Sequence, residues 1–462
     1  MTSLVSGKRF AKSSHVRFLG PISVLIVAGL IVLCPGRVEA QDSEAELLTL
    51  DHAITLALRS NHAIRIAQLA VEKSDDEISA AKTLRLPSVH AYSMVSGNLA
   101  TNDLKFQNPA HDLFPGLGPF FSLSVERKPT AVIGASVITP LSQQYRIGLQ
   151  IKLERLSHDV AQAKLRQQQN ETIAQVKKAY YAVQQTQSAL ISVQAALKSY
   201  RELDKITGDY VVQHVALKAD QLTVQTRLAR AQYEELELSS RIATQKEQLN
   251  SLLGRDIGVP FEVARVPEMA SFETELTEAR KVAMEKRPEL QQARLRIQQA
   301  TLDRRITKSQ FIPDVSAGFI YLGPRNFGDA VPRNFANVGV AMTWEIFDWG
   351  RKKNKLAAKD KAIEQANAGV KETEDQVLID VGDKLRKLQL AGQALRVARL
   401  SEESAKENLR VSTGRYKFQA VLLSDVLQSQ ASLAEASHEY QRALLTFWTA
   451  KAEFEKALGE DK

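Results

Sequence analysis

The amino-acid sequence predicts a mainly α-helical chain that also supplies four strands to a transmembrane β-barrel shared between copies. Three observations lead to this fold class: an N-terminal export signal, an internal two-fold repeat, and alternating apolar and polar strands beside long helices in each repeat. The 462 residues are 44% hydrophobic and 25% charged, which is typical of a folded chain and not of a disordered one.

Residues 1–40 have the features of a secretory signal peptide. A basic N-terminal region precedes the apolar run PISVLIVAGLIVL (21–33), and VEA (38–40) is a small-residue cleavage signal. Two alternatives remain open. The apolar run could be a membrane-anchoring helix, although it is short for a span. Cys34 could carry a lipid, although Leu33 stands where a lipoprotein signal has a small residue.

Cysteine content and charge exclude several classes of protein. Cys34 is the single cysteine, which excludes a disulfide framework and a Cys-based zinc site. The leader holds five Lys/Arg and one acid, so the formal net charge of +8 falls to +4 in the mature chain. This charge is too small and too scattered for nucleic-acid binding. We find no nucleophile elbow, phosphate loop or metal-ligand spacing, so neither an enzyme nor a cofactor is indicated.

The mature chain consists of two copies of one unit. A shift of 226 residues aligns residues 48–89 with a stretch that begins at Thr274, without a gap. A second pair of segments, 206–237 and 412–443, also aligns, and both copies then end on a Leu-Gly pair. A repeat of this kind means that both halves of the chain adopt the same fold. We define repeat one as 41–273 and repeat two as 274–462.

Long helices dominate both repeats. Proline is absent between Pro140 and Pro260 and after Pro332, and these stretches are rich in Gln, Ala, Glu, Lys and Arg. Taken alone, the first stretch favours a soluble helical bundle. Its apolar residues follow the narrow seam of a coiled coil, at Ile173, Val176, Tyr180, Val183, Leu190, Val193, Leu197 and Tyr200.

Each repeat has the same predicted order of short helix, strand, loop, strand, long helix, turn and helix. The long helices would span about 80 and about 95 Å, and the two shorter helices of each repeat add to about 95 Å. We therefore expect each long helix to lie antiparallel to two short helices in series, with the strands at one end and the turn at the other. Repeat two gains 14 residues between the second strand and the seam, either as two inserted heptads or as a junction loop at 347–353. The predicted ranges are 61–86, 87–97, 98–142, 143–153, 154–207, 208–216 and 217–254, then 288–312, 313–323, 324–335, 336–346, 350–413, 414–421 and 422–459.

Alternation of apolar and polar residues predicts the four strands, most clearly in YRIGLQIKL (145–153). Each strand has about 11 residues, the length that a tilted strand needs to cross a bilayer. One such strand would more often belong to a soluble sheet. Four cannot close a barrel, and open edges do not survive in lipid, so we expect three chains to share a twelve-stranded barrel. Its expected lumen-facing residues are Arg146, Gln150, Lys152 and Thr343.

Taken together, these features resemble the TolC-like outer-membrane factor family over the whole mature chain. The resemblance is carried by the repeat, by RPEL (287–290), FIPDVSAGF (311–319) and WEIFDWGR (344–351), and by a TGxY turn in each repeat. It implies a homotrimer with a barrel in the outer membrane of a Gram-negative-type envelope and a long periplasmic helical barrel. It also implies an exit duct for small molecules, metals or proteins, joined by a periplasmic adaptor protein to an inner-membrane transporter that supplies the energy.

The resemblance places an adaptor-docking tip at the two helical turns. The family usually has a glycine six residues before the aspartate of each turn; here these residues are His214 and Gln419, which implies a different type of adaptor. Both turns also carry apolar residues that have no evident partner in the chain, and their glycines could end helices. The expected tip residues are Gly208, Tyr210, Gln213, His214, Val215, Gly414, Gln419, Ala420, Val421 and Leu422.

The resemblance also implies a gate at the periplasmic mouth, where acidic rings bind cations and a hydrogen-bonded tyrosine holds the mouth shut. Asp220 and Asp425 begin the returning helices, and Tyr416 matches the tyrosine with Asp220 as its partner. Gln428 stands where a second acidic ring is usual, so we expect a weaker cation-binding gate. The simpler alternative is that both aspartates only stabilise helix N-termini.

Two other classes of envelope protein share part of this pattern. A trimeric adhesin also builds a twelve-stranded barrel from three chains, but its four strands stand together at the C-terminus, whereas residues 431–459 read as helix. A periplasmic adaptor or coiled-coil scaffold would explain the helices but not four matched strands.

Overall fold

The computed structural model describes residues 46–97, 99, 102–107, 120–125, 128–214, 216–264, 274–327, 332–418 and 420–459. The predicted signal peptide lies outside the described residues. Repeat one contains β1 (Glu46–Leu48), α1 (Leu50–Ser60), α2 (His62–Thr83), β2 (Ser88–Gly97), β3 (Asn102–Gln107), β4 (Phe120–Val125), β5 (Pro129–Pro140), α3 (Gln144–Val212), α4 (Lys218–Leu253) and β6 (Phe261–Val263). Repeat two contains α5 (Leu276–Lys286), α6 (Pro288–Ser309), β7 (Asp314–Arg325), β8 (Phe335–Thr343), α7 (Arg351–Lys417) and α8 (Leu423–Leu458).

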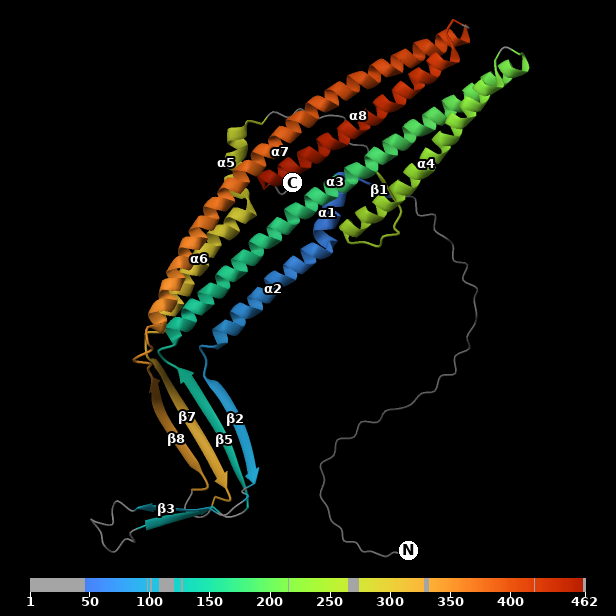
Figure 1. Ribbon diagram of the computed structural model, residues 1–462. Coiled ribbons are helices and arrows are strands. Elements are labelled where there is room, and N and C mark those ends of the chain that lie inside the picture. Colours follow the sequence, from blue (N-terminus) through green and yellow to red (C-terminus); the bar gives the residue numbers. More distant parts are fainter. Residues whose placement is uncertain are drawn as a thin grey trace, which may run out of the picture. The chain divides into compact units, whose positions relative to one another are not determined.

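Two long helices organise the helical part, and each packs against two shorter ones in series (Figure 1). Helix α3 lies against α2 and α4, and α7 lies against α6 and α8, as the predicted lengths require. At 69 and 67 residues, α3 and α7 are about 104 and about 100 Å long. Contacts of α3 with α6 and α8 join the two repeats. The predicted seam is confirmed on α3 by the buried side chains of Ile173, Val176, Tyr180, Val183 and Leu197.

The main hydrophobic core lies midway along the helices, where α1 and α5 pack against α3 and α7. A short parallel pair, β1 with β6, joins this core. The Tyr180 hydroxyl lies 2.9 Å from the carbonyl oxygen of Leu48 and 3.0 Å from that of Ala264, which ties α3 to this pair. Helices α4 and α8 then end on Gly254 and Gly459, both in the left-handed conformation that suits glycine.

Four antiparallel strands form one sheet in the order β2-β5-β7-β8. The register places Thr139, Ala317 and Val340 opposite one another, so alternate residues of all four strands share a face. This face, here called the apolar face, is lined by Val89, Ala91, Ser93, Val95, Ala131, Ile133, Ala135, Val137, Thr139, Val315, Ala317, Phe319, Tyr321, Ala336, Val338, Val340 and Met342, with Gly323 and Arg325 at the end far from the helices. Among the described residues, no further strand pairs with the outer edges of β2 and β8.

The predicted strand at 143–153 is wrong. YRIGLQIKL is the first part of α3, and the second strand of repeat one is β5, PTAVIGASVITP, inside the range expected to be a loop. The physical reason lies in residue type. Residues of β5 are mostly β-branched or small and stand between two prolines, which favours a strand, whereas 145–153 continues without a break into good helix formers.

This correction also removes the 14-residue gain expected in repeat two. Helices α3 and α4 match α7 and α8 at a shift of 205 to 207 residues from start to end, with no insertion. The repeats differ in the connection between their strands, which is 98–128 in repeat one and only 326–334 in repeat two. The longer connection contains the β3–β4 pair.

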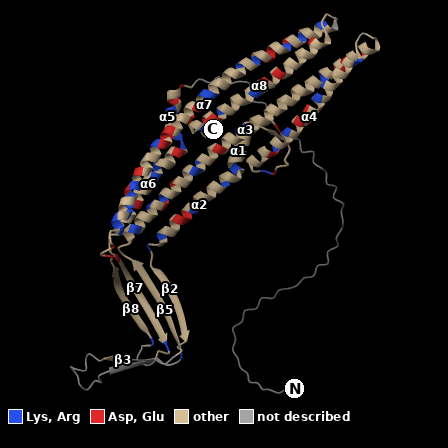
Figure 2. Ribbon diagram, in the orientation of Figure 1, with Lys and Arg blue, Asp and Glu red and all other residues tan. Residues whose placement is uncertain are grey.

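Charged residues follow the helices and avoid the four-stranded sheet (Figure 2). Within β2, β5, β7 and β8 the only charged residues are Asp314 and Arg325, at the two ends of β7. In the part of the chain that the structure describes, none of the helices is long and apolar enough to cross a membrane.

Candidate functional site at the hairpin tips

The two helical hairpins turn over fewer residues than the sequence suggests. The turn between α3 and α4 lies at 213–217 and that between α7 and α8 at 418–422, not at 208–216 and 414–421. Gly208 and Gly414 lie inside α3 and α7, so the expectation that they end these helices is wrong. Each helix continues past its glycine, because a glycine inside a helix weakens it but does not by itself end it.

His214 occupies the backbone conformation that a glycine would favour. Its φ is 60°, in the left-handed region just after the end of α3. The amide groups of His214 and Ala216 donate to the carbonyl oxygens of Val211 and Tyr210, at 3.1 and 3.2 Å. On the second hairpin the Ala420 amide donates to the Arg415 carbonyl at 3.0 Å. Among non-glycine residues, His is one of the more tolerant of a positive φ.

Asp220 and Asp425 perform the same task at the starts of α4 and α8. Both helices begin after a leucine, whose side chain cannot accept a hydrogen bond. The Leu217 amide donates to Asp220 Oδ2 and the Leu422 amide to Asp425 Oδ2, each at 3.1 Å. A carboxylate in the first turn also complements the positive end of the helix. The helix-stabilising role is therefore present in both hairpins.

An aromatic contact joins the two hairpins below their tips. The rings of Tyr210 on α3 and Tyr416 on α7 have centroids 6.3 Å apart and are inclined at 55°. Tyr416 is 9% exposed and packs with a small apolar cluster, here called the tip cluster. The buried members of the tip cluster are Leu203, Val224, Tyr416 and Val426.

The environment of Tyr416 raises the pKa of its hydroxyl above the ordinary value, chiefly through burial and the neighbouring Tyr210. The nearby Thr207 hydroxyl offsets part of this effect, although Thr207 Oγ1 makes no hydrogen bond of ordinary geometry within the described residues. The negative charge of Asp220 raises the pKa of Tyr416 slightly further. No hydrogen bond joins Asp220 to Tyr416 in the described part of the chain.

The remaining tip residues divide into packed and exposed sets. Val421 packs against the tip cluster, whereas Gln213, Ala420 and Gln428 are exposed. The tips also present large apolar side chains to solvent, including Phe418 at 86% and Leu422 at 71% exposure. Val215 and Gln419 lie outside the described residues.

Three of the four expected lumen residues are not on a strand, because the segment that was predicted to be their strand is the first part of helix α3. Arg146 pairs with Asp314 at 3.1 Å, and the Gln150 side chain donates to Glu154 at 2.7 Å. Lys152 lines a groove between α3 and α6. Thr343 is the last residue of β8, on the opposite face from Val340, so its assignment to the lumen stays a prediction.

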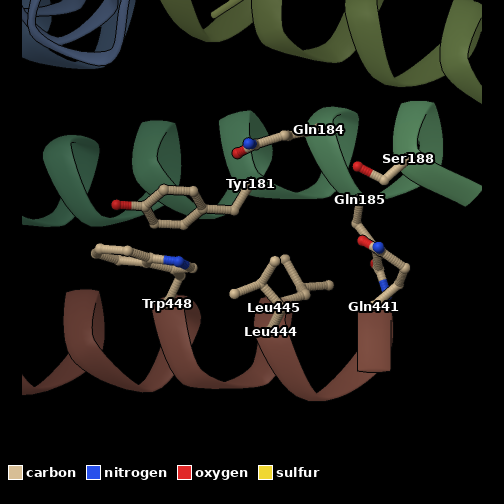
Figure 3. A pocket seen from close by; sticks show the side chains of 8 residues that line it. All are labelled: Tyr181, Gln184, Gln185, Ser188, Gln441, Leu444, Leu445 and Trp448. Carbon is tan, nitrogen blue, oxygen red and sulfur yellow. The ribbon is translucent and has the colours of Figure 1, made fainter. Parts of the chain in front are cut away.

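A small pocket between α3 and α8 is not a ligand site. Figure 3 shows Tyr181 facing Trp448 across it, with ring centroids 5.4 Å apart and an angle of 33°. Its free volume is about 10 Å³, room for about one water molecule. It therefore serves the packing of the two repeats.

The tip cluster was missed by sequence reasoning, although a signal existed. The predicted seam stops at Tyr200, but Leu203, Thr207 and Tyr210 continue its spacings of three, four and three. Extending the seam by these three positions would have placed Tyr210 at the contact between the hairpins.

Comparisons with known proteins match both the sequence and the fold. The family described as outer membrane efflux protein matches residues 53–255 and 279–460, which cover most of both repeats. The chain therefore belongs to the outer membrane efflux protein family. Its TolC-like architecture, its efflux function, and its location in the outer membrane with a periplasmic helical domain agree with the sequence-based expectations.

Solved channels share the fold at low sequence identity. The outer-membrane channel OprN is 17% identical with a TM-score of 0.72, over 89% of each chain. The outer membrane protein VceC from Vibrio cholerae is 16% identical with a TM-score of 0.68, over 89% of this chain and 96% of that one. The Campylobacter jejuni outer membrane channel CmeC is 14% identical with a TM-score of 0.71, over 89% of this chain and 85% of that one. Comparison with curated proteins gives no match.

Proposed function

We propose that three copies of this chain close one barrel and form the exit duct of a pump assembly, with a periplasmic adaptor protein docked on the hairpin tips. One observation carries the proposal: among the described residues, the sheet has four strands, and its edges β2 and β8 pair with no further strand. Unpaired backbone groups are very unfavourable in lipid, so neither edge can face the bilayer.

The geometry of the edges favours identical copies. Strand β2 runs away from the helices and β8 runs toward them, so β8 of one copy meets β2 of the next in the antiparallel sense already used within the sheet. The apolar faces then form a continuous outer surface. Three copies give twelve strands, within the range of known membrane barrels.

The exposed apolar side chains of the tips support the docking part of the proposal. Phe418 and Leu422 lie at the far ends of the hairpins from the sheet, where the described residues of this chain offer no cover. An apolar group of this kind marks an interface with another protein. The energy for export would come from an inner-membrane transporter bound through the adaptor.

Cysteine cross-linking tests the assembly, because the expected mature chain has no cysteine. We expect Val95→Cys on β2 with Val340→Cys on β8 to give covalent dimers and trimers in outer membranes, and nothing larger. Ile133→Cys on the inner strand β5 replaces Val95→Cys as the matched control and should leave monomers. Monomers from the edge pair, or a ladder that continues beyond three, would contradict a closed ring of three copies.

A further inference from the structure

The connection between β8 and α7 presents large apolar side chains that are at least half exposed to solvent. Trp344, Ile346 and Phe347 are exposed, and Trp349 is 89% exposed. We call residues 344–349 the junction segment. It begins directly after the last residue of β8, so it lies where the sheet ends and the helices begin (Figure 1).

The backbone of the junction segment is held in an unfavourable conformation. Trp349 has a φ of 55°, in the left-handed region that bulky residues avoid. The Asp348 carboxylate accepts from the amides of Gly350 and Lys352, at 3.1 and 2.8 Å. Glu345 adds an ion pair with Arg351 at 2.5 Å. Strain persists only where the surroundings impose it, and it is a reason to look for a function.

The strained residue forms part of a rigid aromatic pair. The rings of Phe347 and Trp349 meet edge to face, with centroids 4.8 Å apart and an angle of 69°. Tryptophan in particular is enriched where a membrane protein passes from lipid to water. The conformation of Trp349 therefore turns a large amphipathic ring outward beside the membrane-facing sheet.

A basic run follows the aromatic pair. Residues 351–361 hold six Lys/Arg and one acid, Asp360, and Figure 2 shows the basic residues at this end of α7. Arg351 is engaged by Glu345, whereas Lys353 and Lys355 are exposed on the first turns of the helix. Exposed cations beside a bilayer attract anionic headgroups.

Aromatic side chains at the level of the headgroups are usual at the edges of membrane barrels. We propose that the junction segment is, beyond this, a lipid anchor selective for anionic phospholipids of the periplasmic leaflet. Trp344, Phe347 and Trp349 lie at the level of the headgroups, and Lys353 and Lys355 bind the anionic headgroups. The proposal rests on the outer-membrane placement of the sheet. A second copy of the chain is the alternative occupant, but the cations and the direct continuity with the membrane-facing sheet favour lipid.

Tryptophan fluorescence tests the anchor, because the chain has three tryptophans and Trp448 is buried in the helical core. The mature trimer carrying Trp344→Phe would be placed in nanodiscs of phosphatidylcholine and phosphatidylglycerol, with bromine on the acyl chains of one lipid at a time. We expect brominated phosphatidylglycerol to quench Trp349 more than brominated phosphatidylcholine does at equal content. Lys353→Gln with Lys355→Gln should remove this difference and keep the quenching. If the two brominated lipids quench Trp349 equally while Lys353 and Lys355 are still present, the preference for anionic lipid is overturned.

A second set of variants separates the anchor from the membrane placement and from packing between copies. Val340→Trp, in a chain with Trp344→Phe and Trp349→Phe, reports on the apolar face. If Val340→Trp is quenched and Trp349 is not, the anchor is wrong and the placement stands; if neither is quenched, the placement fails. Trp349→Gly relieves the left-handed strain, so the trimer should melt at the same or a higher temperature. Loss of the trimer would show that a second copy covers Trp349 and would overturn the proposal.

Discussion

At the scale of single residues, the hairpin tips show how one polar side chain can replace a missing helix cap. Leucine occupies the N-cap position of both returning helices, and an aspartate three residues later accepts the hydrogen bond of the leucine amide. His214 shows a similar replacement, because it keeps a conformation that the family resemblance associates with glycine. The backbone of a tip can therefore be held by a residue other than glycine.

Substitution of the capping aspartate should loosen the start of α8. Asp425→Ala removes the only side-chain acceptor for the Leu422 amide among the described residues, which should cost about 1 kcal/mol of local stability. Hydrogen exchange of the first turn of α8 measures this effect, and Asp425→Asn should keep most of the protection. If Asp425→Ala leaves exchange unchanged but alters conductance in a planar bilayer, the residue acts in the gate and not as a cap.

At the scale of elements, the sheet predicts which substitutions a membrane tolerates. Val137 on β5 lies on the apolar face, and the neighbouring Ser136 lies on the other. Val137→Arg should block assembly, since an arginine facing the middle of the bilayer costs about 2–4 kcal/mol per chain. Asn337→Arg, at an exposed residue of β8 on the same face as Ser136, is the control and should assemble, as judged by trimers in the outer membrane. Equal tolerance of both would mean that the apolar face does not meet lipid.

The strands also show how far sequence reasoning reaches. The strands at 87–97, 313–323 and 336–346 and the helices α2, α4, α6, α7 and α8 were predicted to within a few residues, whereas α1 and α5 were not predicted and α3 begins ten residues before its expected start. The fourth strand was misplaced because the strict alternation was given more weight than the helix formers that follow it. In α3, Leu149 and Ile151 lie on nearly opposite sides of the helix, and both are buried because α3 packs against α2 and α6. At the tips, the capping role was foreseen as an alternative. The contact of Tyr210 with Tyr416 was not, because it joins segments 206 residues apart.

The exposed apolar side chains of the turn offer a test of docking. Leu422→Glu places a charge where an adaptor would bind, and it should reduce export several-fold without affecting the trimer. Resistance to exported compounds, in a strain that carries the cognate adaptor and pump, measures the effect. Ile257→Glu, at a site of similar exposure away from the tip, is the control. Normal export with Leu422→Glu would place the docking surface elsewhere.

At the scale of the whole molecule, ion pairs between α3 and α8 help to hold the repeats together. Lys177 contacts Glu455 at 2.5 Å, and Lys456 pairs with Glu171. Burial alone would raise the pKa of Glu171, but the hydrogen bond and charge of Lys456 outweigh it and lower the pKa below its ordinary value of 4.5.

This shift predicts a loss of stability in acid. A carboxyl group with a lowered pKa stabilises the fold above its unfolded value, and that contribution disappears as the pH falls through the folded value. The melting temperature should therefore decline below about pH 4.5, and less steeply in Glu171→Gln than in the native chain. Glu407→Gln, at an exposed pair on α7, is the control and should follow the native curve closely, because surface pairs contribute little. Parallel curves for Glu171→Gln and the native chain would contradict a role for this pair.

The matching helix lengths of the two repeats have a consequence for any surface that meets the tips. Helices α4 and α8 both have 36 residues, and α3 and α7 differ by two, which is about 3 Å along the axis. In a ring of three chains, six hairpins would therefore end at nearly one height and form a level rim. An insertion of one heptad into both helices of one hairpin would lengthen that hairpin in each of the three chains. Three of the six hairpin tips, alternating around the ring, would then stand about 10 Å above the others. A flat partner could then touch only every second hairpin, so both repeats are constrained to keep the same length even where their sequences diverge.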